Sequence, residues 1–230
     1  MTQNNQSEIT ALQKHTEEFE WIKRNFDKFK HELELINRQN PYECELYSVI
    51  ACIIRCCMND EGVSLRDVSK IQKCKRLNTE NFRSKWGNPD FVVLDKKYNT
   101  HEKVNENDIQ KYGIVGAVEI KYMYYSLVKD VGKGIFELNF KDEIEEHIRY
   151  FKKVIYTNGL VWHFYLFDDS KPKGDIRDIE EDELIKKFTL GTVESRSISW
   201  EPNAEKIWED LVEFLHGIDW KMYSKWGERI

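Results

Sequence analysis

The order of apolar segments along the chain constrains the fold more than any other feature of the sequence. Segments with apolar residues at helical spacing alternate with short apolar runs of strand length. Helical spacing is found in residues 43–58 and 141–157, and strand-like runs lie at 91–94, 114–122 and 158–169. Because helical and strand-like segments alternate in this way, we expect an α/β domain in which helices flank a central mixed β-sheet. We expect one further strand near residues 188–200 and a C-terminal helix at 203–218.

The N-terminal part of the chain carries one continuous apolar seam. Residues 7–38 contain no glycine or proline, and apolar or aromatic residues recur there every three or four positions. These residues are Leu12, His15, Phe19, Ile22, Phe26, Phe29, Leu33 and Ile36. The pattern predicts one long helix that either packs onto the body of the protein or pairs with a second copy or a partner subunit. We therefore divide the chain into an N-terminal helical extension (1–40), a core (41–200) and a C-terminal helical segment (201–230).

Composition limits the setting in which the protein works. The sequence has no run of about 18 uninterrupted apolar residues, and its N-terminus lacks the build of a signal peptide, so we expect a cytoplasmic protein without membrane association. Five cysteines lie between Cys44 and Cys74 without a CxxC spacing, which favours a reducing compartment. The formal net charge of −6 argues against a globally basic surface, so any site for a polyanion must be a local patch.

The densest run of positive charge reads "KIQKCKRLNTENFRSK" and spans residues 70–85. Phe82 and Trp86 stand close by and are candidates for stacking on bases. Most runs of this kind are solvated helix faces or loops, and this remains the alternative interpretation. If the run binds nucleic acid, the residues that we expect to contact phosphates are Lys73, Lys75, Arg76, Arg83 and Lys85.

Three charged residues accompany the first two strand-like runs. Asp90 precedes the run at 91–94, while Glu119 and Lys121 lie inside the run at 114–122. Strand periodicity places Glu119 and Lys121 on one face and their apolar neighbours on the other. A buried carboxylate and ammonium need a partner or an ion, so they form either a structural ion pair or a site. If Asp90 and Glu119 converge, their oxygens suit Mg²⁺, and Lys121 would orient or help deprotonate a water that attacks a phosphodiester.

In these residues the chain resembles the PD-(D/E)xK nucleases, a superfamily that includes restriction endonucleases and Holliday-junction resolvases. Pro89-Asp90 and Glu119-Ile120-Lys121 match its motif. The segment "HIRYFKKVIYTNGLVWHFYLFD" is similar to the helix and strand that follow the motif in restriction-type members. The resemblance implies a restriction endonuclease-like core. It also implies a metal site formed by Asp90, Glu119 and the backbone carbonyl of Ile120, with Lys121 as a catalytic residue.

Many members of the superfamily also have a glutamate early in the first core helix, in an E-x-x-L setting. Glu43 and Glu45 of "ECEL" are the two candidates. Helical phase turns Glu43 closer to the apolar face, so we expect Glu43 to join the metal and catalytic set, with Glu45 in reserve. His147 stands where restriction-type members have the glutamine of a Q-x-x-Y motif. It is therefore either part of the site or an isolated structural histidine.

Together these features predict a Mg²⁺- or Mn²⁺-dependent endonuclease, with DNA favoured over RNA as its substrate. Restriction or defence against foreign DNA is the role that analogy suggests. An RNA endonuclease is one alternative, because viral cap-snatching enzymes share this core. The other alternative is a non-catalytic protein that keeps the nuclease fold and assembles with a partner through its N-terminal helix.

Overall fold

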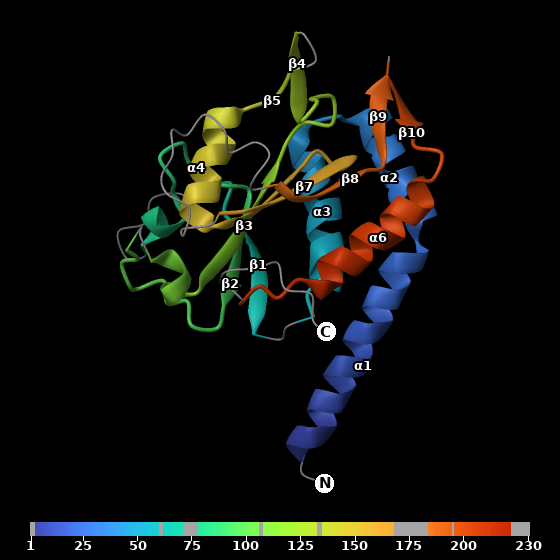
Figure 1. Ribbon diagram of the computed structural model, residues 1–230. Coiled ribbons are helices and arrows are strands. Elements are labelled where there is room, and N and C mark those ends of the chain that lie inside the picture. The colour runs from blue at the N-terminus through green and yellow to red at the C-terminus, as the bar shows by residue number, and fades with distance from the viewer. Residues whose placement is uncertain are drawn as a thin grey trace.

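A six-stranded sheet forms the centre of the protein (Figure 1). The computed structural model describes residues 3–59, 62–70, 78–105, 108–132, 135–167, 184–194 and 196–221. In sheet order the strands are β1 (Val63–Asp67), β2 (Phe91–Asp95), β3 (Ile114–Ile120), β6 (Lys153–Thr157), β7 (Val161–Leu166) and β8 (Leu184–Thr189). β3 and β6 run parallel and the other neighbours run antiparallel. The sheet is therefore mixed, as expected.

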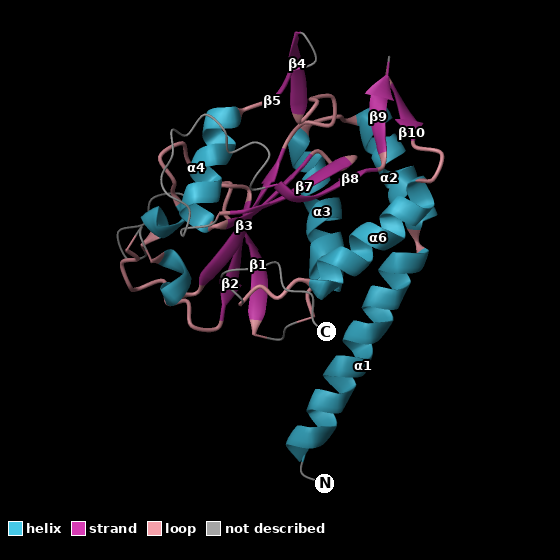
Figure 2. Cartoon of the chain, in the orientation of Figure 1, coloured by secondary structure: helices cyan, strands magenta, loops and turns pink. Residues whose placement is uncertain are grey.

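Helices cover both faces of this sheet (Figure 2). α3 (Glu43–Cys57) and α6 (Ala204–Gly217) pack on one face, and α4 (Lys141–Phe151) packs on the other. Together with the strand order, these layers confirm the α/β fold class and the C-terminal helix. The smaller elements are η1 (Thr79–Phe82), η2 (Ile109–Tyr112) and the hairpins β4 (Val128–Gly132) with β5 (Ile135–Leu138) and β9 (Gly191–Glu194) with β10 (Ser197–Trp200).

The helical segment at 141–157 is shorter than its apolar spacing predicts. α4 ends at Phe151, and Lys152 has a positive φ of 66° with ψ of −40°, which takes the chain out of the helix. The next residues, Val154 and Ile155 among them, belong to strand β6. The prediction that Ile155 extends the helix was therefore wrong. Ile155 falls near helical spacing, but once the helix has ended at Lys152 the β-branched residues that follow favour a strand.

The segment at 188–200 forms more than the single strand that was expected. β8 ends at Thr189, and the chain then leaves the main sheet to form the β9–β10 hairpin. Gly191 permits this departure, because a Cβ atom there would lie 2.5 Å from the carbonyl oxygen of Ser199. A side chain at position 191 would therefore push the two hairpin strands apart.

The N-terminal segment is broken into two helices, so the prediction of one long helix was wrong. α1 (Gln3–Arg24) and α2 (Phe26–Gln39) meet at Asn25, whose φ of −110° and ψ of 37° lie outside the helical region. The Asn25 amide also donates to the Trp21 carbonyl, a local bond with which asparagine competes against a helix. The seam residues that the structure finds buried are Ile22, Phe26, Phe29, Leu33 and Ile36.

This seam packs on the body of the same chain. The rings of Phe29 and Trp208 stack with centroids 4.3 Å apart, and Phe26 packs edge-on against Trp200. The indole N–H of Trp208 donates to the Ile22 carbonyl at 3.2 Å. The seam residues from Ile22 to Ile36 therefore pack against other parts of the same chain. For this part of the seam, packing within the chain is favoured over dimerisation.

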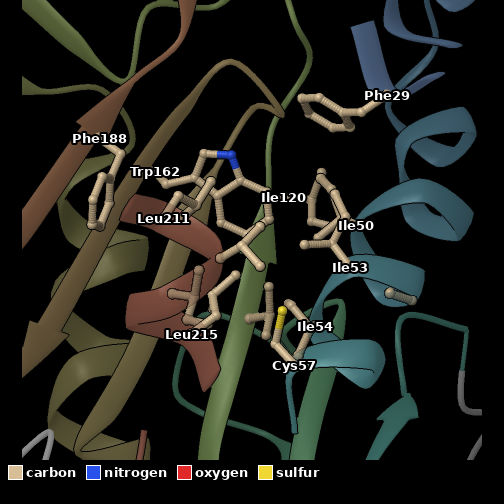
Figure 3. Packing of buried hydrophobic residues seen from close by; sticks show 14 of the residues in the cluster. Phe29, Ile50, Ile53, Ile54, Cys57, Ile120, Trp162, Phe188, Leu211 and Leu215 are labelled. Carbon is tan, nitrogen blue, oxygen red and sulfur yellow. The ribbon is translucent and has the colours of Figure 1, made fainter. Parts of the chain in front are cut away.

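Two apolar clusters fill the space on either side of the sheet. Figure 3 shows the larger one, in which Phe29, Ile50 and Trp162 approach one another from α2, α3 and β7. The smaller cluster includes Ile144 and Ile148 of α4. The helices in the described part of the chain include none that is long and apolar enough to cross a membrane. The cysteines that lie there, Cys44, Cys52, Cys56 and Cys57, are free thiols.

Candidate functional site

The pairing of β2 with β3 brings Asp90 and Glu119 to the same end of the sheet. Phe91 pairs with Val118, so the next position outward places Asp90 opposite Glu119. Asp90 Oδ2 accepts a hydrogen bond of 2.7 Å from the backbone N–H of Ile120. Both carboxylates are buried, with exposed fractions of 6% for Asp90 and 4% for Glu119. The register of two apolar strands is therefore what sets two acids side by side.

Lys121 follows β3 and points to the same side as Glu119. Its Nζ lies 2.6 Å from Glu119 Oε1 and 2.6 Å from Glu143 Oε2, the latter on the first turn of α4. The Lys121 backbone N–H donates to the Thr157 carbonyl at 2.8 Å and so continues the pairing with β6. The lysine is therefore held at its backbone by the sheet and at its ammonium by two carboxylates.

The first turns of α3 approach the site from the other side of the sheet end. The Tyr47 hydroxyl donates to Asp90 Oδ1 and also lies 3.4 Å from Glu43 Oε1. Glu43 is half-buried, and the backbone of Tyr122 is one of its polar neighbours. Glu45 is exposed and accepts a hydrogen bond of 2.7 Å from the Asn40 amide. The structure thus turns Glu43 toward the site through Tyr47 and turns Glu45 away.

Burial disfavours the charged form of the acids in this group. It raises the pKa of Asp90 to about 6, against two hydrogen bonds that lower it. Burial and then the neighbouring Asp90 raise the pKa of Glu119 well above its usual range. Burial alone would lower the pKa of Lys121, but Glu119 and Glu143 together raise it above its ordinary value. The ammonium of Lys121 therefore stays charged, while the acids resist ionisation.

The carboxyl groups of the site outnumber its one ammonium group, that of Lys121. Its ammonium interacts with four carboxyl groups, those of Glu43, Asp90, Glu119 and Glu143. Burial also raises the pKa of Glu43. Crowded carboxyl groups of this kind are a common way to bind a divalent cation or to tune an acid for catalysis.

His147 lies beneath the site on α4 and is fully buried. Its Nδ1 is 3.6 Å from Glu119 Oε2, and the Gly87 backbone is its other polar neighbour. Among the described residues, neither ring nitrogen has a hydrogen-bond partner of normal geometry. Burial lowers the pKa of His147 to about 4, so the ring is neutral at physiological pH. The structure therefore places a neutral, buried His147 ring against Glu119.

The oxygens of Asp90 and Glu119 fit a hard divalent cation in their chemistry. Glu119 Oε2 is buried and has no hydrogen-bond partner in the described part of the chain, whereas Asp90 Oδ1 is engaged by Tyr47. Across the residues that are described, no group of three or more His, Cys, Asp or Glu side chains is already arranged to hold a metal ion. The set expected from the sequence has three such side chains, Asp90, Glu119 and Glu43, with the Ile120 carbonyl. The structure pairs Asp90 with Glu119 but leaves Glu43 linked to Asp90 only through the Tyr47 hydroxyl.

The described end of the basic run lies near the site. Arg83, Lys85 and Trp86 are exposed, and the loop that carries them leads through Gly87, which neighbours His147. Phe82 is buried in the smaller apolar cluster, so its expected role in stacking on bases was wrong. Three expected phosphate contacts, Lys73, Lys75 and Arg76, lie outside the described residues.

Sequence reasoning missed three residues of this site. Tyr47 lies four positions after Glu43 and Glu143 lies four positions before His147, so each shares a helix face with a residue that was singled out. The helical spacing could therefore have found both. Phe140, whose ring centroid is 4.8 Å from Lys121 Nζ, precedes α4 and gave no periodic signal.

Comparison of the chain with family models, with curated proteins and with solved structures gives no match. Its function is therefore inferred from the geometry of the site.

Proposed function

We propose that this protein is a Mg²⁺- or Mn²⁺-dependent endonuclease that hydrolyses phosphodiester bonds in DNA. The observation that carries the proposal is the buried group formed by Asp90, Glu119 and Lys121 at one end of the central sheet. In this group the carboxyl groups exceed the charge of the lysine, and one carboxylate oxygen of Glu119 is buried without a partner among the described residues. The same residues carry the resemblance to the PD-(D/E)xK nucleases.

Asp90, Glu119 and the Ile120 carbonyl would hold the cation, and Glu43 would approach it from α3. When bound, a divalent cation polarises the phosphodiester and offsets the negative charge of the crowded carboxylates. Tyr47 would have to release Asp90 Oδ1, because its hydroxyl donates to that oxygen. Tyr47 is thus a positioning residue that links Glu43 to Asp90.

Lys121 would stabilise the transition state as a cation. Its pKa is raised by Glu119 and Glu143 after burial has lowered it, so the side chain carries a full charge. A charged ammonium can orient an attacking water and offset charge on the phosphoryl oxygens, but it cannot accept a proton from that water. The charge therefore favours an orienting and stabilising role for Lys121 over a role as general base.

The competing interpretation is a structural ion pair, which would suit a non-catalytic protein of the same fold. A structural pair gains most when each charge is matched and each polar atom has a hydrogen bond. Here Glu119 Oε1 forms an ion pair with Lys121. The other oxygen, Oε2, and the adjacent His147 ring have no hydrogen bonds of normal geometry among the described residues. Unsatisfied buried polar groups cost stability, which supports a functional origin.

Incubation of the purified protein with labelled DNA and RNA tests the proposal directly. Single-stranded and double-stranded forms of each are compared in Mg²⁺, in Mn²⁺ and in EDTA. Cleavage of DNA that requires metal is the expected result, and Lys121→Ala serves as the matched inactive control. Cleavage of RNA alone would favour the RNA endonuclease alternative. Absence of cleavage on all substrates, with all metals, would favour the non-catalytic alternative.

A further inference from the structure

A cluster of exposed aromatic rings borders the candidate site. Phe140 begins it, with its ring centroid 4.8 Å from the ammonium of Lys121. Tyr125 packs edge-on against Phe140 at 5.5 Å, and Tyr122 lies 5.7 Å from Tyr125 and 5.5 Å from Tyr124. We call these four residues, Tyr122, Tyr124, Tyr125 and Phe140, the aromatic array. The array therefore runs outward from Lys121 without a break.

Three of the four rings of the array are exposed to solvent, and Tyr122 is partly buried. The exposed fractions are 38% for Tyr124, 50% for Tyr125 and 42% for Phe140. Contiguous exposed apolar surface on a soluble protein commonly marks a place where a ligand or partner binds. An aromatic surface beside a charged site thus needs an occupant that has both flat apolar groups and charge.

The backbone that carries the array is held in place. The Asn158 amide donates to the Tyr125 carbonyl at 2.9 Å and to the Met123 carbonyl at 3.4 Å. The Tyr125 backbone N–H donates to the Tyr122 carbonyl at 2.9 Å. Phe140 has a left-handed backbone with φ of 58°, which non-glycine residues seldom adopt and which is concentrated at functional sites. The rings therefore sit on a fixed support.

We propose that the aromatic array stacks on unpaired bases and that the substrate strand is single-stranded DNA where it enters the site. A base in a duplex has both faces covered by its neighbours, so an aromatic ring can stack on it only where the strand is unpaired. Each nucleotide also presents a phosphate, which the site beside Phe140 would receive. This inference rests on the proposed function for the identity of the polymer. To the proposed function it adds that the bound part of the substrate is unpaired, as in a single strand, a flap or an end.

Binding in EDTA tests the array without cleavage. The affinity of the full-length protein for a fluorescent single-stranded DNA oligonucleotide is measured by anisotropy, and the duplex and the single-stranded RNA of the same sequence are measured alongside. Tyr125→Leu should weaken binding of single-stranded DNA by roughly 5- to 150-fold, the range that loss of one base–aromatic stack produces. Tyr125→Phe keeps the ring and should bind as wild type does.

Trp21→Leu is the matched control, because Trp21 is an exposed aromatic residue on α1, 47% exposed, outside the array. It should leave DNA binding unchanged. Equal losses in Tyr125→Leu and Tyr125→Phe would overturn the stacking role. Binding of the duplex as tight as that of the single strand, or RNA binding more than about tenfold tighter than DNA binding, would overturn the assignment to single-stranded DNA.

The result also separates this inference from the proposed function. Metal-dependent cleavage of duplex DNA that needs Lys121 and is unaffected by Tyr125→Leu would keep the nuclease and overturn the array. Loss of single-strand binding in Tyr125→Leu, with no metal-dependent cleavage of any substrate, would support the array and overturn the nuclease.

Discussion

The two faces of the central sheet bury different kinds of side chain. The face covered by α3, α6 and the N-terminal helices is filled by a large apolar cluster, in which Trp162, Trp208 and Leu211 are fully buried. The face covered by α4 buries apolar residues too, but it also buries His147 and His163. Strand geometry explains how one sheet can do both, because successive side chains point to opposite faces.

Both faces of the sheet bury polar groups, some with hydrogen-bond partners and some without. On the apolar face the buried Lys153 ammonium donates to the Asp219 carbonyl at 2.7 Å, and the Trp162 indole donates to the Gly159 carbonyl. On the α4 face His163 Nε2 and Glu119 Oε2 have no hydrogen-bond partner in the described residues. The described residues on the apolar side include such an atom as well, Asn37 Oδ1. What sets the α4 face apart is that its unpaired Glu119 oxygen lies beside Asp90 and Lys121, the group on which the proposed function rests.

Removal of the lysine should have the largest effect, and it tests whether the polar face serves chemistry. Lys121→Ala should lower the rate of DNA cleavage by roughly 10² to 10⁴, because the positioned charge beside the phosphoryl group is lost. Single-turnover cleavage at saturating metal measures this rate. Lys121→Arg is the matched probe, since it keeps a charge but not the compact ammonium. A cleavage rate close to wild type in Lys121→Ala would remove the residue from the site.

The free energy of unfolding should separate the two faces. Leu211→Ala leaves a cavity in the apolar face and should lower that free energy by about 2–5 kcal/mol. Glu119→Gln should leave it unchanged or raise it in EDTA, because it removes a carboxylate whose pKa is raised by burial and by Asp90. Lys121 would still have Glu143 at 2.6 Å, so its charge is not left alone. Urea denaturation of both variants measures the difference.

The structural ion pair predicts the opposite result for Glu119→Gln. Breaking a buried pair typically costs about 3 to 5 kcal/mol. The metal response supplies a second readout, because a cation that binds the folded protein raises its melting temperature. Wild type should therefore melt higher in Mn²⁺ than in EDTA, and Glu119→Gln should lose most of that shift. Destabilised Glu119→Gln together with a wild type that does not respond to metal would contradict the proposed site.

The buried histidines of the α4 face should lower the free energy of unfolding as the pH falls. Burial, with Lys187 adding to it, lowers the pKa of His163 from 6.5 to about 3. The folded state thus binds the proton less well than the unfolded state. The contribution of a neutral His163 to the free energy of unfolding is fully present above pH 6.5. It is lost as the pH falls toward 3, by up to about 1.4 kcal/mol per pH unit. His163→Gln, which can still bond the Tyr165 hydroxyl, should reduce this slope of unfolding free energy against pH.

A residual slope should remain in His163→Gln. Burial also lowers the pKa of His147 to about 4, so His147 contributes to the same loss of stability in acid. The exposed His31→Gln is the control and should follow the wild-type curve. If His163→Gln also follows that curve, the ring is not a source of the acid sensitivity.

The sequence predicts the strands of the site better than its contacts. Asp90 and Glu119 could be placed at one end of the sheet because strand periodicity is short-range and two apolar runs must pair. The role of Tyr47 could not, because a hydroxyl that reaches Asp90 depends on how α3 packs against the sheet end. The break at Asn25 was missed for a related reason: the apolar seam continues through it, and only a local side-chain bond reveals it.

The β6 strand shows a further limit of sequence patterns. Ile155 falls near helical spacing from Phe151, so the periodicity alone extends α4 through residues that form a strand. What ends the helix is the positive φ of Lys152, for which the sequence gives no glycine or asparagine signal. The aromatic array was missed because its four residues have no common period, and they meet only where the loop after β3 approaches the start of α4.

The smallest effect that we predict concerns the two glutamates of α3, and it sharpens the contrast between a side chain turned toward the site and one turned away. Glu43→Gln should lower the cleavage rate by roughly 10- to 100-fold, the range for outer partners of a metal site. Glu43 reaches Asp90 through Tyr47, and its neutral amide would weaken that link. Glu45→Gln should leave cleavage near wild type, because Glu45 is exposed and bonded to Asn40. Parallel cleavage assays of the two variants, with melting temperatures to exclude unfolding, measure the difference. Equal losses in both would show that charge on the first turn of α3 matters and that orientation does not.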